Sequence, residues 1–241
     1  MVALLIVWEA LPRLGIVPPI IIAPLSQTLT AAYTDFPAFA DALQSTFIAI
    51  VLALLIAYVG GGVVGLALGA IKPLRQTVLP LFASIYAFPM IVTYPVLTAW
   101  MGIGPASQIW FAGIYGFFPM VLATAAGGDL VNAGHVNAAR SMGATRLQIV
   151  LHILVPSAVP AIVSGLRLSG ALVAVGVVAA EMLSSTSGIG FLITQNRTMF
   201  KTPQVYLGIV LVLVFAGLLD YGIGALERRA LRWMGRGTPN R

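Results

Sequence analysis

Long apolar runs separated by short polar stretches make up most of this chain. Six runs stand out, at about 2–11, 43–71, 78–101, 108–126, 160–183 and 205–226. A helix that crosses the hydrocarbon core of a membrane needs about 20 apolar residues. All the runs except the first meet or approach that length. The pattern therefore predicts an all-α membrane protein with about six transmembrane helices.

Composition supports the same class of fold. The chain is 59% hydrophobic and only 8% charged, whereas soluble domains average about 25% charged residues. So few charges cannot cover the surface of a soluble protein of 241 residues. A membrane β-barrel would show short segments of alternating polarity rather than long continuous runs. A helical bundle is therefore favoured.

The first run is the least complete of the six. It is short and contains Glu9, so its true start could lie upstream, or its helix could continue past Pro12. It lacks the basic residues that precede the apolar part of a secretory signal peptide. We therefore do not interpret it as a cleavable signal.

Basic residues are distributed unevenly between the two sides of the predicted membrane. Most of them lie on one side: Lys72, Arg75, Arg140, Arg146, Arg167, Arg228, Arg229, Arg232, Arg236 and Arg241. Arg13, Arg197 and Lys201 lie on the other side. Because Lys and Arg collect in cytoplasmic loops, the larger set is predicted to face the cytoplasm, with both termini there and an even number of spans. This topology accounts for the net charge of +6, and we expect no nucleic-acid partner.

Glycines and prolines mark two of the predicted helices. Gly61, Gly65 and Gly69 recur at every fourth residue, so they share one face of a helix. Small residues there let another helix approach closely, and we favour helix packing over a hinge. Pro89 and Pro95 are expected to kink or interrupt the third run. Such a kink could widen a passage or be a simple packing bend.

The predicted cytoplasmic loop at 127–159 has its own helical pattern. Asn132 is suited to cap a first helix, and Gly143 is suited to end it in a left-handed conformation. Thr145 and Gln148 have the spacing of a capping box for a second helix, which we expect to continue until Pro156. The small residues of this loop form either a knob for a partner's groove or part of an amphipathic helix lying on the bilayer.

A specific motif resolves the reading of this loop. The run Asn137-Ala138-Ala139-Arg140-Ser141-Met142-Gly143, followed nine residues later by Ile153-Leu154-Val155-Pro156, resembles the EAA loop of ABC importer permeases. Two positions depart from the motif: Asn137 replaces Glu, and Val155 replaces Leu. The stretches Ala180-Glu181-Met182-Leu183 and Ser187-Gly188-Ile189-Gly190 are similar to the nitrate/sulfonate/taurine branch of the same family.

The resemblance implies a type I ABC importer permease fold, with one permease domain over residues 1–241 and a coupling loop at 127–159 in a bacterial cytoplasmic membrane. Two ATP-binding subunits, a second permease copy, an extracytoplasmic binding protein and membrane lipid are the implied partners. Contact with the ATP-binding subunits is implied for Asn137, Ala138, Ala139, Arg140, Gly143, Ala144 and Arg146. The missing Glu puts in doubt an ionic contact at position 137.

The chain is not expected to be an enzyme or to bind a cofactor. It has no match to the phosphate-binding motif G-x-x-x-x-G-K-[ST]. ATP and Mg are therefore expected in the partner subunit. We also expect no metal site, because His135 and His152 are isolated from each other and from any carboxylate cluster.

Several polar residues lie within or beside the predicted membrane helices. The candidates for lining a translocation path are Ser84, Thr93, Tyr94, Ser169 and Glu181. Hydrogen bonds between helices explain such side chains as well. Glu181 either lines the path or accepts hydrogen bonds from the turn at 184–190. Glu9 and Asp220 are expected to pair with Arg13 and with Arg228 or Arg229, or to face water.

A self-contained carrier or channel is the alternative function. It would need intramembrane charges in matched halves or a selectivity loop, and neither pattern is present in the sequence. A membrane enzyme would need clustered catalytic residues, which are also lacking. The substrate is left open between nitrate, sulfonates, taurine and heterocyclic vitamin precursors, as is the choice between a homodimer and a heterodimer.

Overall fold

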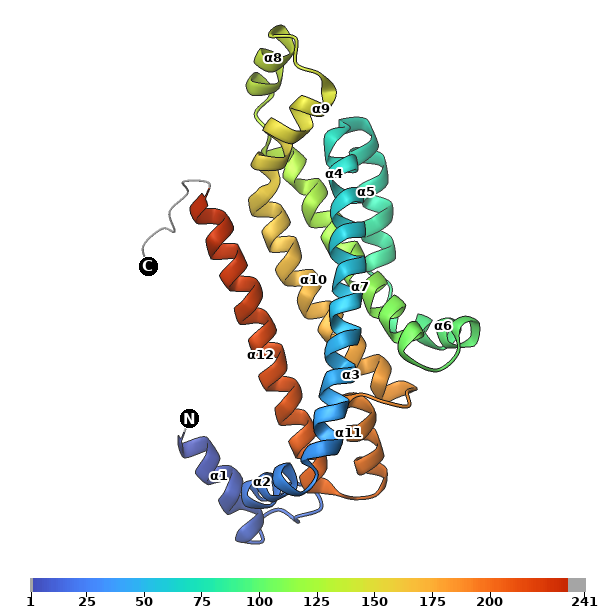
Figure 1. Cartoon of the computed structure of the whole chain (residues 1–241), viewed down its shortest axis with the longest axis vertical. Helices are drawn as coiled ribbons and strands as arrows, with labels where there is room; N and C mark the ends of the chain where they lie inside the picture. Colours follow the sequence, from blue (N-terminus) through green and yellow to red (C-terminus); the bar gives the residue numbers. More distant parts are fainter. Residues whose placement is uncertain (1, 234–241) are drawn as a thin grey trace.

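A computed structural model describes residues 2–233, and within them the chain forms helices joined by turns, with no strand. The molecule is elongated, and most of its long helices run roughly along its long axis (Figure 1). The helix labelled α8 lies at one tip, called here the α8 end, while α1 and α2 lie at the opposite end. The two ends therefore carry different parts of the sequence.

Four segments of the described chain are long and apolar enough to cross a membrane, and a bent pair of helices is a fifth candidate. Four are continuous: Phe36–Ala70, Pro105–Leu130, Arg146–Leu183 and Thr202–Ala225. The fifth is a pair of helical segments, Lys72–Tyr86 and Met90–Met101, bent by 76° at the break. This break includes Pro89, so the interruption predicted from the prolines is present.

The first apolar run does not make a full crossing. It forms α1 (Val2–Arg13), which has 12 residues and is about 18 Å long at the usual helical rise, against about 30 Å of hydrocarbon. The described chain thus has four candidate crossings, or five if the bent pair counts as one, where the sequence predicts about six. The placement of both termini in the cytoplasm depended on an even number and stays a prediction.

The first crossing is continuous but contains a wider turn. It consists of α3 (Phe36–Leu55), a π-helical turn at Ile56–Gly60 and α4 (Gly61–Ala70). The second consists of α5 (Lys72–Tyr86), a 3-10 turn at Met90–Thr93 and α6 (Tyr94–Met101). The Gly102–Gly104 turn then leads to α7 (Pro105–Ala126). In Figure 1, α4 and α5 form a hairpin whose turn lies near the α8 end.

The core of the chain forms around α7. This helix packs along α10 (Val155–Leu183) and also contacts α3 and α4. Phe111, Ala112 and Val121 are fully buried in it. A layer of small and β-branched side chains closes the contact between α3, α7 and α10: Ala49, Ile50, Ala53, Ala57, Ala112, Val173 and Val177. Small residues at these positions let the helix backbones approach closely.

The three glycines spaced by four residues face α7. A Cβ atom at Gly61 would lie 2.9 Å from the Phe117 carbonyl oxygen, and one at Gly65 would lie 2.6 Å from Thr124 Cβ. A Cβ at Gly69 would lie 3.3 Å from the Ala125 carbonyl oxygen. All three are buried. Their lack of side chains therefore sets the separation of α4 and α7.

The remaining helices lie at the end away from α8 or run back from it. α2 (Leu25–Thr34) and α11 (Ile189–Thr198) are short, and α12 (Thr202–Trp233) runs from there toward the α8 end (Figure 1). Glu9 ties α1 to α2, because its carboxylate accepts hydrogen bonds from the Ser26 N–H and hydroxyl, both at 2.9 Å. It also pairs with Arg13 at 2.6 Å, as predicted. The Ser26 N–H stabilises the ionised carboxylate, which lowers the pKa of Glu9.

Candidate functional site

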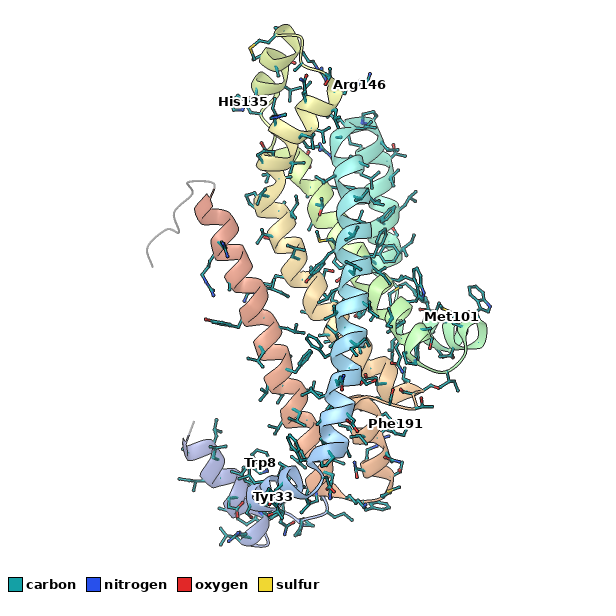
Figure 2. The ribbon with its side chains drawn as sticks, in the orientation of Figure 1. Trp8, Tyr33, Met101, His135, Arg146 and Phe191 are labelled. Atoms are coloured by element: carbon teal, nitrogen blue, oxygen red, sulfur yellow. The ribbon has the colours of Figure 1, made fainter. Side chains whose placement is uncertain are left out.

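The segment from 127 to 154 protrudes at the α8 end. It contains a 3-10 turn at Gly127–Leu130, α8 (Ala133–Ser141), α9 (Arg146–Ile149) and a π-helical turn at Val150–Leu154. Figure 2 shows His135 and Arg146 at this tip, whereas Trp8 and Tyr33 lie at the other end of the molecule. We call residues 127–154 the coupling segment.

Local hydrogen bonds shape the coupling segment as the sequence predicts. The Asn132 side chain accepts a hydrogen bond from the Gly134 N–H at 2.8 Å and caps α8. Gly143 has a φ of +81° and turns the chain after this helix. Thr145 and Gln148 form the predicted capping box, in which each side chain accepts from the other residue's backbone N–H.

The second helix of the coupling segment continues past its predicted end. It does not stop at Pro156 but passes through the π-helical turn into α10, so that 146–183 is one continuous rod. Pro156 lies at the start of α10 and inside this rod, where its missing N–H would interrupt a regular α-helix. The wider turn before it accommodates the proline without breaking the rod. A displacement of α9 can therefore reach the membrane helix α10 directly.

The residues assigned to ATPase contact fall into two groups. Asn137, Ala138, Arg140, Gly143 and Arg146 are exposed. Ala139 is only 8% exposed and Ala144 is half-buried, and a hydrogen bond from the Ala144 N–H to the Ala139 carbonyl joins them at 3.0 Å. Ala139 and Ala144 therefore hold α8 against the following turn. The five exposed residues are available to a partner.

Met142 adds an exposed apolar side chain to the coupling segment. It ends α8 and is 81% exposed. Beneath it lies a hollow of about 410 Å³. Its walls are formed by Ala139, Met142, Gly143, Ala144, Gln148, Ile149, His152 and Ile153. An exposed methionine is an adaptable anchor for a partner groove, and its place just before the turn glycine is the signal that sequence reasoning missed.

The candidate path residues occupy different environments. Ser84 is exposed on α5, and its hydroxyl donates to the Pro80 carbonyl at 2.9 Å. Thr93 is half-buried and donates to the Met90 carbonyl at 2.7 Å. Both bonds are local, so each hydroxyl is satisfied by a carbonyl of its own helical segment and forms no tie to another helix in these bonds.

Tyr94 and Ser169 are buried between helices. The Tyr94 hydroxyl donates to the Ser184 carbonyl at 2.9 Å. The Ser169 hydroxyl donates to the Gly116 carbonyl at 2.7 Å, which joins α10 to α7. Each side chain is at most 1% exposed. Both therefore act within this chain as ties between helices.

Glu181 is also enclosed by the chain, at 2% exposed. Its carboxylate accepts a hydrogen bond from the Thr46 hydroxyl at 2.8 Å and one from the Gly190 N–H at 2.9 Å. Thr46 in turn accepts from the Ile189 N–H at 2.9 Å. Gly188 has a φ of +99°, and a Cβ there would lie 2.2 Å from the carboxylate. The geometry favours the second interpretation of Glu181, in which it orders the turn at 184–190.

More polar residues fasten the same turn. Gln108 of α7 donates to the Ser185 hydroxyl at 2.6 Å, and Ser185 donates to the Ser187 carbonyl at 2.7 Å. The Ser45 and Ser187 hydroxyls lie 3.1 Å apart. Thr46, Gln108 and Ser45 were not singled out from the sequence, because isolated polar residues in apolar runs give no sign of their partner. Together these bonds tie α3, α7 and α10 at the end away from α8.

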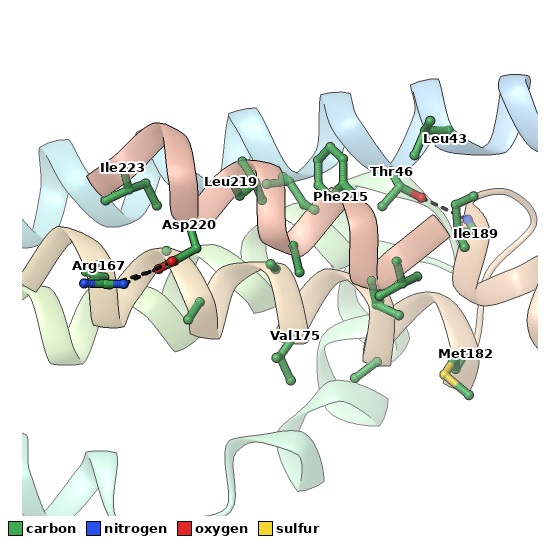
Figure 3. A pocket seen from close by; sticks show the side chains of 18 residues that line it. Leu43, Thr46, Arg167, Val175, Met182, Ile189, Phe215, Leu219, Asp220 and Ile223 are labelled. Carbon is green, nitrogen blue, oxygen red and sulfur yellow. Dashed lines mark hydrogen bonds and ion pairs between the residues drawn. The ribbon is translucent and has the colours of Figure 1, made fainter. Parts of the chain in front are cut away.

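A mostly apolar cavity lies between α3, α10 and α12 (Figure 3). Its volume is about 510 Å³. At one end, Arg167 of α10 forms a two-pronged ion pair with Asp220 of α12, with nitrogen–oxygen distances of 2.9 and 3.0 Å. The predicted pairing of Asp220 with Arg228 or Arg229 is thus replaced by a bond between helices. Arg228 instead lies over the Tyr221 ring, 5.7 Å from its centre.

A family comparison decides the identity of this architecture. Residues 61–232 match the model for the binding-protein-dependent transport system inner membrane component. The chain belongs to this family. It is a membrane permease subunit of an ABC importer, and the matched region contains the whole coupling segment. The alternative of a self-contained carrier is therefore set aside.

Individual relatives agree with this assignment. The chain is 31% identical to the taurine transport system permease protein TauC of Escherichia coli, over 96% of this chain and 87% of the relative. It is 27% identical to the putative aliphatic sulfonates transport permease protein SsuC of Bacillus subtilis, over 94% and 83%. A structure of the MetNI methionine ABC transporter in an inward-facing conformation aligns with a TM-score of 0.68 and 21% identity, over 81% of this chain and 97% of that chain. The permease thus has the type I fold.

Proposed function

We propose that this permease imports a small sulfonate-type solute of the taurine class, delivered by an extracytoplasmic binding protein. The support is the 31% identity to the taurine permease over 96% of this chain, against 26% identity to the formylaminopyrimidine permease over 95% of it. Permeases named for formylaminopyrimidine and riboflavin transport match at 26% and 28% identity. A heterocyclic vitamin precursor is the second candidate substrate.

The coupling segment is proposed to receive force from a cytoplasmic ATPase subunit, which holds the ATP and Mg. The observation that carries this proposal is its rigid, capped protrusion, with exposed Asn137, Ala138 and Arg140 beside the exposed Met142. A short, capped helix moves as a body, so little displacement is lost within it. The continuous rod 146–183 then carries the displacement into the membrane.

Asn137 changes the chemistry of that contact. The side chain is exposed, and its amide can both donate and accept hydrogen bonds with the ATPase. It cannot form the ion pair that the family's Glu would form. Arg140 and Arg146, both exposed, are then the charged residues proposed to meet an acidic partner surface.

The path itself is proposed to lie between two copies of this chain in a homodimer, in a bacterial cytoplasmic membrane, with the coupling segment on the cytoplasmic side. Large apolar side chains are exposed along α5 and α6, including Leu81 at 60% and Trp100 at 80%. In a membrane such faces contact lipid or another subunit. Ser84 and Thr93 lie on this part of the chain and remain the candidates for lining the path.

The docking proposal is tested in proteoliposomes that contain the permease, its ATPase subunits and its binding protein. Gly143→Val places a β-branched residue at a φ of +81°, a conformation that such residues strongly disfavour. We expect the ATPase subunits to dissociate or to lose stimulation by the binding protein. Gly102→Val is the matched control, because Gly102 also has a φ of +81° and open space around it, but lies before α7 in another part of the chain. Normal stimulation in Gly143→Val would contradict the proposal.

The substrate proposal needs a separate measurement. Calorimetry of the purified binding protein with taurine, an alkanesulfonate and a formylaminopyrimidine should show binding of the first two. Binding of the pyrimidine alone would favour the vitamin-precursor alternative. Uptake by the purified permease without the ATPase would contradict the import mechanism as a whole.

A further inference from the structure

Arg75 is a buried cation near the α8 end of the chain. It lies in the first turn of α5 and is 7% exposed, whereas Lys72 in the same turn is exposed. A cation in a first turn faces the positive end of its own helix dipole, and burial of a charge is unfavourable unless it is paired. Its position therefore requires partners outside α5.

Arg75 finds those partners in two other elements. Its Nη2 atom forms an ion pair with Asp129 of the Gly127–Leu130 turn. Its Nη1 atom donates to the Gly69 carbonyl at 3.2 Å. Gly69 lies in the last turn of α4, where carbonyl groups lack helical partners and carry partial negative charge. One guanidinium thus joins the end of α4, the start of α5 and the base of the coupling segment.

The Gly127–Leu130 turn is clamped on both sides. A Cβ at Gly128 would lie 2.2 Å from Arg75 Nη1 and 2.5 Å from the Gly69 carbonyl oxygen. A Cβ at Gly127 would lie 2.5 Å from Ala158 Cβ in α10. Val131 and Asn132 alone separate this turn from the start of α8. The turn is therefore held between the α4–α5 hairpin and α10, immediately before the helix proposed to receive the force.

We propose that Arg75 is a positioning residue that fastens the base of the coupling segment to the α4–α5 hairpin. A displacement of α8 then moves the hairpin with it. Without the bonds of Arg75, the chain at 127–132 would bend instead. Because α4 packs on α7 through its three buried glycines, the displacement also reaches the core. This inference rests on the proposed docking of the ATPase to α8.

Two spin labels distinguish movement of α8 from movement of the α4–α5 hairpin. The chain contains no cysteine, so His135→Cys, at an exposed position of α8 outside the proposed docking contact, reports on α8, and Leu81→Cys, six residues beyond Arg75, reports on α5. In the assembled transporter, the distance between equivalent labels in the two permease copies is measured with and without ATP. We expect ATP to shift both distances in the otherwise unaltered permease.

Arg75→Gln and Asp129→Asn should keep the α8 shift and reduce the α5 shift to less than half. The double variant should resemble the single ones, because all three remove the same interaction. Arg75→Lys should retain part of the α5 shift, since a lysine keeps the charge but not the two-pronged donor geometry. Lys72→Gln, which removes an exposed charge from the same turn, is the control and should behave as the parent.

The outcomes distinguish the two proposals. A full α5 shift in Arg75→Gln and Asp129→Asn would overturn the role of Arg75. Loss of both shifts in these variants would also overturn it, because the residue would then support the fold or the docking itself. Absence of an α8 shift in the parent protein would instead count against the docking proposal.

Discussion

Thr46 and Glu181 are 135 positions apart in the sequence, and their side chains are joined by a hydrogen bond of 2.8 Å inside the chain. The Thr46 hydroxyl donates to the carboxylate and accepts from the Ile189 N–H. It thus connects α3 to both ends of the turn between α10 and α11. A single hydroxyl therefore satisfies two polar groups that the chain itself buries.

Thr46→Val should destabilise the permease, although the two side chains have nearly the same shape. The substitution leaves the carboxylate and the Ile189 N–H each without one partner, which costs about 1–3 kcal/mol. Thr46→Ser keeps the hydroxyl and should stay closer to the parent. Thermal unfolding of the detergent-solubilised protein measures the difference. Equal midpoints for the valine and serine variants would show that the hydroxyl is not needed.

Local features of the coupling segment are readable from sequence because they depend on neighbours. Asn132, Gly143 and the Thr145–Gln148 pair act within a few residues of themselves, so their spacing identifies both helices and the turn between them. The apolar runs likewise give the four continuous crossings, because those runs are long and apolar enough to span the membrane. The break in the third run follows from Pro89, but its angle of 76° does not.

Long-range partners are where sequence reasoning fails. Arg75 looks like one more basic residue of a cytoplasmic loop, yet it is buried against Asp129. Asp220 has arginines nearby in sequence, yet it pairs with Arg167, which is 53 positions away. Pro156 suggests a helix end, yet a wider turn carries the helix past it. In the first two cases the packing of separate elements decides a contact that local pattern cannot specify.

The contact of α4 with α7 gives a second prediction. Gly65→Ala would place a Cβ 2.6 Å from Thr124 Cβ and 2.9 Å from the Val121 carbonyl oxygen, so the helices must separate. Overpacking of this kind typically costs about 1–3 kcal/mol. Gly217→Ala on α12 is the matched control, because a Cβ there meets nothing within 4 Å.

The two alanine variants should change the stability of the permease in opposite directions. Alanine is a better helix former than glycine by about 1 kcal/mol, so Gly217→Ala should be neutral or slightly stabilising. The midpoint of thermal unfolding is again the measurement. If Gly65→Ala unfolded at or above the temperature of Gly217→Ala, close packing at this position would be refuted.

The capping box of α9 gives a third prediction. Thr145→Ala removes the side chain that accepts from the Gln148 N–H, and loss of such a cap costs about 1 kcal/mol. Opening of α9 should then become roughly fivefold more frequent, which is the same energy expressed as a ratio. Hydrogen exchange of the Ile149 and Val150 amides, which are bonded to carbonyls of the first turn, measures this opening. Thr145→Ser should keep the parent rate, and an unchanged rate in the alanine variant would mean that packing alone holds the helix.

The Arg167–Asp220 pair gives the last prediction. Counted from the ends of α10 and α12 away from α8, both residues lie about 25 Å along their helices at the usual helical rise, and they border an apolar cavity. Asp220→Leu should be more harmful than the double variant Arg167→Leu/Asp220→Leu. Replacement of Asp220 alone takes two charge-assisted hydrogen bonds from the guanidinium of Arg167, whereas replacement of both residues also removes the charge that those bonds stabilise. The amount of folded protein in the membrane and its unfolding midpoint report the difference, and a double variant no more stable than Asp220→Leu would show that Arg167 stabilises the fold without Asp220.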